Sequence, residues 1–310
     1  MDMPPHEDKA INELLSEKIM LPASDLKEGQ RGQSVCGSLS DARPSKIIHR
    51  LGRSPDMGVS TSRNEHCRPR QSPINIYTKK VRYDSSLRPL YIYYDPKSSR
   101  RLVNVGHCFN VEFEDNNDKS VVSDGPLTGY YRLRQLHFHW GSSDQDGSEH
   151  VIDGQTYPAE LHIVHWNAQK YPSFDEAVKH PDGLAVIGVL LKIGEANPVI
   201  QNIINNLDKV KTKNKECPFT QLDVSSLLPN DRNYWTYQGS LTTPPYSECV
   251  TWIVLQEAIL ISSEQLFHFR GLLCTSESEK PTCILENHRP IQPLEARVVR
   301  SSSKNKTIRP

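Results

Sequence analysis

Short β-rich runs separated by turn-forming residues dominate the chain from Gln71 onward. They include INIYTKKVRY, LYIYYD, FNVEFED, YRLRQLHFHW, AELHIVHWN and CVTWIVLQEAILI, with DNND, SDGP and SSDQDG among the separators. Runs rich in β-branched and aromatic residues, bounded by Gly, Pro, Asn and Asp, are typical of strands joined by turns. We therefore expect one mainly-β domain with short peripheral helices.

Residues 1–66 differ from the rest in composition. Stretches such as GQRGQS and GVSTSRNE show no apolar periodicity, and the hydrophobic content of the whole chain is only 36%. We expect a disordered extension, with a partner-binding segment as the alternative. The expected folded domain spans residues 67–300, followed by a polar tail, 301–310. Near the start of the extension, Ile11, Leu14, Leu15 and Ile19 have helical spacing, which is compatible with a short amphipathic helix before Pro22.

Two helices are expected inside the domain. Asn197 followed by Pro198 is typical of an N-cap with proline at the first helical position. Ser262 and Gln265 have the spacing of a capping box. The apolar residues expected to face inward are Ile200, Ile203, Ile204 and Leu207 in the first helix and Leu266, Phe269 and Leu273 in the second.

Charge and cysteine usage limit the class of protein. Lys and Arg together number 37, as do Asp and Glu, so a zero net charge favours neither nucleic acid nor a charged membrane surface as partner. The N-terminus lacks a secretory signal, and no apolar stretch could span a bilayer. The seven scattered cysteines indicate free thiols in a reducing compartment. We expect a cytoplasmic protein.

The strand YRLRQLHFHW carries two histidines on one face. Because side chains alternate along a strand, Gln135, His137 and His139 share a face, and apolar residues occupy the other. A lone His-x-His could equally belong to a half-exposed strand with its polar residues in water.

The strand AELHIVHWN strengthens the metal hypothesis. Its alternation places Glu160 and His162 on one face, and His165 on the other with the core. A metal-bound imidazole needs an acceptor for its outer ring N–H, which Glu160 can supply to His162 and Gln135 to His137. Three imidazoles on rigid strands predict a catalytic zinc site with one open position.

Six segments, in family order, resemble the landmark segments of α-class carbonic anhydrases, most closely the cytosolic animal members. They are QSPINI at 71–76, LHFHWG at 136–141, GSEH at 147–150, ELHIVHWN at 160–167, YWTYQGSLTTPP at 234–245 and VTWIVL at 250–255. The resemblance implies a large central twisted, mostly antiparallel sheet. It also implies reversible hydration of carbon dioxide to bicarbonate and a proton by zinc-bound hydroxide.

The resemblance also implies a role for individual residues. The zinc ligands would be His137, His139 and His162. Thr242 would accept a hydrogen bond from the hydroxide and donate its own proton to Glu149. The expected substrate pocket is formed by Val164, Val186, Leu241, Thr243, Val250 and Trp252. His107 would carry the proton to solvent, a role that suits a group titrating near neutrality.

The N-terminal part departs from the family pattern. Members usually begin with a tryptophan- and glycine-rich segment, and nothing like it precedes Gln71. Val105 also replaces a polar residue near His107. An impaired binding protein on the carbonic anhydrase fold is therefore the alternative, whereas HExxH, the signature of a zinc protease, does not occur. We expect a monomer whose ligands are carbon dioxide, bicarbonate and sulfonamide-type inhibitors.

Overall fold

The computed structural model describes residues 69–304, in which the expected β-rich runs form strands. The strands are β1 (Asn75–Ile76), β2 (Arg82–Tyr83), β3 (Leu90–Tyr94), β4 (Ser99–Asn104), β5 (Phe109–Phe113), β6 (Ser120–Asp124), β7 (Tyr130–Trp140), β8 (Val151–Ile152), β9 (Ala159–Trp166), β10 (Leu184–Ile193), β11 (Glu216–Pro218), β12 (Tyr234–Gly239), β13 (Val250–Leu255), β14 (Ile259–Ile261) and β15 (Arg300–Ser301). β15 pairs with β12, so the last strand ends at Ser301, one residue past the expected end of the domain.

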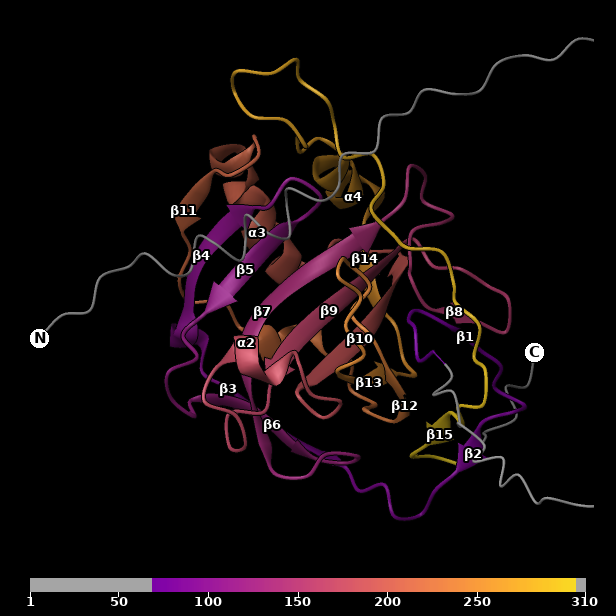
Figure 1. Cartoon of the computed structure of the whole chain (residues 1–310). Coiled ribbons are helices and arrows are strands. Elements are labelled where there is room, and N and C mark those ends of the chain that lie inside the picture. Colours follow the sequence, from indigo (N-terminus) through magenta and orange to yellow (C-terminus); the bar gives the residue numbers. More distant parts are fainter. Residues whose placement is uncertain (1–68, 305–310) are drawn as a thin grey trace, which may run out of the picture. The chain divides into compact units, whose positions relative to one another are not determined.

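Thirteen of these strands form one sheet, and β1 and β8 form a separate pair. The main order is β11-β4-β5-β7-β9-β10-β13-β12-β15-β2, and Figure 1 shows the central strands side by side in this order. Most neighbours are antiparallel, as predicted, but β10 runs parallel to both β13 and β14. The expectation of a mainly-β domain on a large, mostly antiparallel sheet is confirmed.

The helices are short and lie outside the sheet. They are α2 (Phe174–Ala177), α3 (Pro198–Leu207) and α4 (Ser263–Arg270), with 3-10 turns η1 (Pro96–Ser98), η2 (Asp208–Val210) and η3 (Val224–Leu227). The Asn197 side chain caps α3, and Ser262 and Gln265 form the predicted capping box of α4. Leu273 does not belong to α4, because the chain leaves the helix at Gly271, whose N–H caps the last carbonyls.

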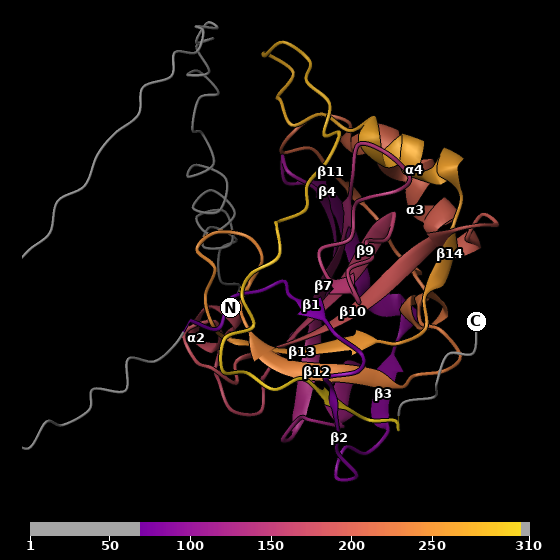
Figure 2. The same cartoon turned by 90° about the vertical axis from the view of Figure 1, so that its right-hand side faces the viewer.

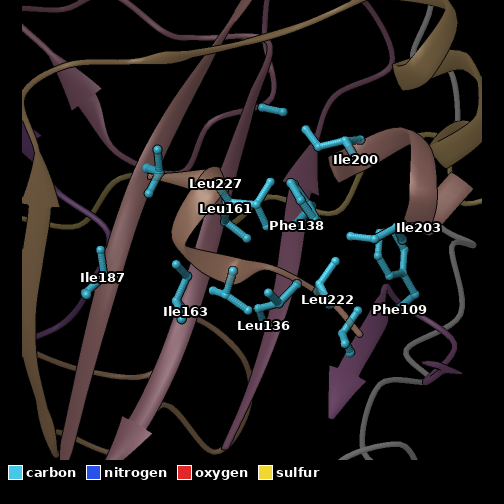
Figure 3. Packing of buried hydrophobic residues seen from close by; sticks show 14 of the residues in the cluster. Phe109, Leu136, Phe138, Leu161, Ile163, Ile187, Ile200, Ile203, Leu222 and Leu227 are labelled. Carbon is cyan, nitrogen blue, oxygen red and sulfur yellow. The ribbon is translucent and has the colours of Figure 1, made fainter. Parts of the chain in front are cut away.

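Apolar side chains pack on both faces of the sheet. On one face, Leu136, Phe138, Leu161 and Ile163 meet the inner residues of α3, α4 and η3. Figure 3 shows these side chains beside Ile200 and Ile203 of α3 and Leu227 of η3. Figure 2, turned by 90°, shows α3 and α4 on this side of the strands. A second apolar cluster lies on the other face, around Trp252. The histidine-bearing face of β7 and β9 is therefore backed by a packed layer.

Further features of the chain concern its peptide bonds, its cysteines, possible membrane spans and the N-terminal extension. The peptide bonds Ser72-Pro73 and Pro244-Pro245 are cis. All five cysteines of the described region are free thiols. No helix there has the length and apolarity that a membrane span requires. The expected helix around residues 11–19, like the rest of the extension, lies outside the described residues.

The aromatic cluster beneath α4 provides a test of this packing. Phe269 is fully buried, with its ring centroid 5.1 Å from those of Phe109 and Phe138, whereas Phe267 on the same helix is 69% exposed. Replacing Phe269 by alanine should lower the free energy of unfolding by about 3–5 kcal/mol because a large cavity is left. Phe267→Ala should change it by less than about 0.5 kcal/mol. Urea denaturation measures both, and equal losses would contradict the packing.

Candidate metal centre

The three predicted histidines meet because β7 and β9 are neighbours in a fixed antiparallel register. His137 lies directly opposite His162, and His139 lies opposite Glu160. The ring centroids of the three histidines are 4.6–5.2 Å apart. A register shift of the strand pair between Leu133 and Gln135 occurs before the first histidine, so regular alternation holds from Gln135 onward. Strand periodicity thus brings the three imidazoles together.

Each imidazole is held by an acceptor at its outer nitrogen. His137 Nδ1 lies 2.8 Å from Gln135 Oε1, and His162 Nε2 lies 2.8 Å from Glu160 Oε1, the two partners expected from sequence. His139 Nδ1 donates to the Asn287 carbonyl at 2.8 Å. A carbonyl can only accept, so the proton of His139 sits on Nδ1 and its Nε2 lone pair points inward.

The inner nitrogens have the arrangement of a ligand set. His137 Nε2 and His139 Nε2 lie 3.1 Å apart, and the three candidate ligand atoms all lie within 4.8 Å of one another. Two lone pairs at this distance repel unless a cation or a proton lies between them. Nitrogens bound tetrahedrally to zinc at about 2.0–2.1 Å are roughly 3.3 Å apart. The donor set therefore fits a zinc ion.

Burial keeps these imidazoles neutral. It lowers the pKa of His139 to about 4 and that of His162 below its usual value. Burial, followed by the neighbouring histidines, lowers the pKa of His137 well below its usual value. Neutral imidazoles are the form that binds metal, so the site has its lone pairs available at pH 7.

A buried carboxylate organises the surroundings of His162. Glu160 is fully buried, and burial alone would raise its pKa, but the interactions with His150 and His162 hold the pKa well below the usual range. His150 Nδ1 lies 2.7 Å from Glu160 Oε1, and His150 Nε2 lies 2.7 Å from the Tyr237 hydroxyl. Gly188 lies opposite His162 on β10, and a Cβ there would be 3.0 Å from Glu160 Oε1.

Glu149 and Thr242 lie beside the histidines. Glu149 Oε1 accepts the backbone N–H of Arg289 at 2.8 Å, and Oε2 lies 3.9 Å from His162 Nδ1. Burial raises the pKa of Glu149 to about 7, although His162 and the Thr242 hydroxyl oppose the rise. Oε2 is buried without a hydrogen-bond partner of normal geometry. This oxygen is the acceptor available to Thr242.

A cleft of about 420 Å³ leads to His137 and His162. The expected pocket residues that line it are Val164, Val186, Leu241, Thr243 and Trp252, together with Thr242. Val250 is fully buried in the apolar cluster around Trp252 and does not line the cleft. The cleft therefore combines an apolar wall with two threonine hydroxyls.

His107 does not line this cleft. It lies half-buried in the wall of a second cavity, which shares Thr242 and Thr243 with the cleft. Burial, followed by His139 and Lys213, lowers the pKa of His107 to about 4. His107 shares this second cavity with the two threonines, but its pKa lies below the neutral range expected of a shuttle.

Sequence reasoning missed Asn287, which holds both the end of β7 and the candidate metal ligand His139 in place. Its carbonyl accepts from His139, its Oδ1 accepts from the backbone N–H of Trp140 at 2.7 Å, and its Nδ2 donates to the Phe138 carbonyl. Asn287 is 148 residues from His139. A backbone acceptor has no side-chain signature, so no pattern in the sequence could have identified it.

Comparison with known proteins identifies relatives that all belong to one family. Residues 60–303 match the sequence model of the eukaryotic-type carbonic anhydrase family. Carbonic anhydrase 1 of Monodelphis domestica is 54% identical over 234 residues, which cover 76% of this chain and 89% of that protein. Carbonic anhydrase 1 of Mus musculus is 53% identical over 232 residues, covering 75% and 89% respectively.

The acceptor at His137 can be tested by metal affinity. Gln135→Ala removes the oxygen 2.8 Å from His137 Nδ1, and we expect zinc binding to weaken by about tenfold because the ring loses its orientation. Gln135→Glu keeps an acceptor oxygen there and should stay within about threefold of the parent. Competition with a chelator at pH 7 gives both constants. Equal weakening in both variants would rule out the acceptor role.

Proposed function

Because this chain belongs to the eukaryotic-type carbonic anhydrase family, we propose that it hydrates carbon dioxide reversibly at a zinc ion held by His137, His139 and His162. The products are bicarbonate and a proton. The meeting of three neutral imidazoles, two of them with inner nitrogens 3.1 Å apart, carries this proposal. The reaction is inferred from the family relationship, and its location in the chain is inferred from the imidazole cluster.

His137 Nε2, His139 Nε2 and His162 Nδ1 would hold the metal, since the other nitrogen of each ring faces an acceptor. A bound zinc ion lowers the pKa of a coordinated water to about 7, a value known from carbonic anhydrases themselves. The outer acceptors fix the three rings before any metal arrives. The chain therefore contributes a site that needs little rearrangement.

Thr242 and Glu149 orient the attacking water. Glu149 is fixed by the Arg289 N–H on one oxygen, which leaves the other oxygen for the Thr242 hydroxyl. A threonine that donates its proton to a carboxylate can only accept from the water. A lone pair of that water is then directed at the carbon of the substrate. A cation near Glu149 also favours the charged carboxylate that this arrangement requires.

The apolar wall of the cleft accommodates carbon dioxide. Val164, Val186 and Trp252 are buried and line the cleft beside His162, and Leu241 completes the wall. A small nonpolar molecule gains from leaving water and needs no charged anchor. Thr243 offers a hydroxyl at the same place, suited to the polar bicarbonate product.

The proton is proposed to leave past His107, on the side of the second cavity. At a pKa of about 4 the imidazole is a weak acceptor near neutral pH, so its contribution to turnover is expected to be small. Val105, two residues away, offers no polar group for a water chain. Exchange with buffer through the second cavity is then the larger route.

The remaining properties follow from the family and the site. We propose a monomeric cytoplasmic enzyme whose ligands are carbon dioxide, bicarbonate and sulfonamide-type inhibitors. Neither nucleic acid nor a membrane is an expected partner, in keeping with the zero net charge of the chain.

Hydration of carbon dioxide is the direct test of this function. The purified full chain should bind one zinc ion, and stopped-flow measurement should show hydration that a sulfonamide abolishes. Removing the metal by chelation should abolish hydration, and added zinc should restore it. A folded chain with one bound zinc and no sulfonamide-sensitive hydration would overturn the proposal in favour of an impaired binding protein.

The proton route can be tested separately. His107→Ala should lower turnover in dilute buffer by about two- to tenfold, less than the roughly 10²–10⁴ of an efficient proton-transfer group, because its pKa is poorly matched. Added imidazole should restore the rate, and hydration in concentrated buffer should equal that of the parent. An unchanged rate in dilute buffer would show that His107 carries no protons.

A further inference from the structure

Ser72 lies near the start of the described domain, and its side chain is fully buried. It does not line the cleft that leads to the imidazoles. Its hydrogen bonds nevertheless lead to three separate parts of the site. We propose that Ser72 is a positioning residue, which holds His162, the loop of Thr242 and Glu149 in fixed relation to one another. This role deepens the proposed function and rests on it.

A chain of buried hydrogen bonds joins Ser72 to His162. The Tyr237 hydroxyl donates to Ser72 Oγ at 3.0 Å, and the same hydroxyl lies 2.7 Å from His150 Nε2. His150 Nδ1 and His162 Nε2 lie 2.7 Å and 2.8 Å from Glu160 Oε1. Tyr237, the most exposed of these side chains, has only 3% of its surface in contact with solvent. Because no water can replace a lost partner there, the Ser72 oxygen fixes the Tyr237 hydroxyl and, through it, the His150 ring.

Ser72 also holds the start of the loop that carries Thr242. The Ser240 backbone N–H donates to Ser72 Oγ at 3.0 Å, and the Ser72 backbone N–H donates to Ser240 Oγ at 2.9 Å. The Trp252 indole donates to the Ser240 carbonyl at 3.0 Å. Ser240 is two residues before Thr242. The reciprocal bonds therefore fix the backbone from which the Thr242 side chain projects.

The backbone carbonyl of Ser72 provides a third connection, to Glu149. Arg289 Nη1 donates to that carbonyl at 2.7 Å and to Gln71 Oε1 at 2.9 Å. The backbone N–H of the same arginine donates to Glu149 Oε1 at 2.8 Å. Ser72 thus anchors the residue whose backbone fixes the carboxylate that is proposed to accept from Thr242.

The Ser72 hydroxyl has room for its two donors only because Gly239 lacks a side chain. A Cβ at Gly239 would lie 2.2 Å from Ser72 Oγ, so the hydroxyl could not stay in place. A serine oxygen can accept two hydrogen bonds, and this one accepts from both Tyr237 and Ser240. Alanine at position 72 would leave both donors buried without a partner. The loss should therefore be felt along both connections at once.

Ser99 on β4 is the matched control for a purely structural role. It is also fully buried, and its Oγ accepts the backbone N–H of Leu222 at 3.2 Å and donates to the Pro96 carbonyl at 3.3 Å. None of these three residues lines the cleft or the second cavity. Loss of the Ser99 hydroxyl should lower the free energy of unfolding without altering the metal centre.

Zinc release from the purified full chain tests the connection to His162. Ser72→Ala should speed release by about three- to tenfold, less than the 10–100-fold typical of a group that contacts a ligand. Tyr237→Phe removes only the hydroxyl between Ser72 and His150 and should give a similar increase. The double variant should release zinc no faster than Tyr237→Phe alone, because Ser72 acts on His162 through that hydroxyl. Ser99→Ala should release zinc at the parent rate, and transfer to a chromogenic chelator measures all four variants.

Amide hydrogen exchange at Ser240 tests the second connection without metal or turnover. Exchange followed by NMR should become about tenfold faster in Ser72→Ala, because the N–H loses its acceptor, and should stay at the parent rate in Tyr237→Phe and Ser99→Ala. Additive zinc release in the double variant, or equal release from Ser72→Ala and Ser99→Ala, would overturn the proposal. Tyr237→Phe at the parent rate of zinc release would do the same, even if Ser72→Ala did not fold. A chain that binds zinc but hydrates no carbon dioxide would contradict the proposed function alone, since neither readout depends on turnover.

Discussion

The antiparallel register between β7 and β9 is the constraint on which the rest of the site depends. It sets His137 opposite His162 and His139 opposite Glu160, at the centre of a sheet whose other face is a packed core. A slip by one residue would turn one strand's polar side chains into that core and its apolar ones into the cleft. The burial of Phe138 and Leu161 therefore specifies the register, and the register positions the imidazoles.

The buried carboxylate of Glu160 also fixes the position of a neighbouring loop, the one that carries Glu149 and His150. Glu160 accepts four N–H groups, from the backbone of Glu149 and His150 and from the rings of His150 and His162. A carboxylate buried away from water is stable only where hydrogen bonds replace its hydration. Because Glu149 and His150 must reach the carboxylate, the loop that carries Glu149 is fixed relative to the histidines. In the proposed mechanism, the orientation of the attacking water thus depends on a group that never touches it.

Local patterns in the sequence were sufficient for much of this architecture. Alternation along β7 and β9 selected His162 over His165, and His165 lies buried, 2.8 Å from the Tyr94 hydroxyl. The caps of α3 and α4 were also readable, because a cap is decided by residues within one turn. Long-range features were not readable. Three such features depend on segments far apart in the chain. They are the hydrogen bond from His139 to the Asn287 carbonyl, the burial of Val250 away from the cleft and the lowered pKa of His107.

Gly188 lies on β10, a strand that carries none of the three candidate ligands, but it can affect the candidate metal centre through Glu160. It lies opposite His162, and the space that a Cβ would need is bounded by Glu160 Oε1 at 3.0 Å. A methyl group at position 188 would displace the Glu160 carboxylate by a few tenths of an ångström. The three histidines and the residues that line the cleft would be unchanged. The residence time of the metal could then be tuned independently of the donor set. For protein engineering, position 188 separates how long the ion is retained from what holds it.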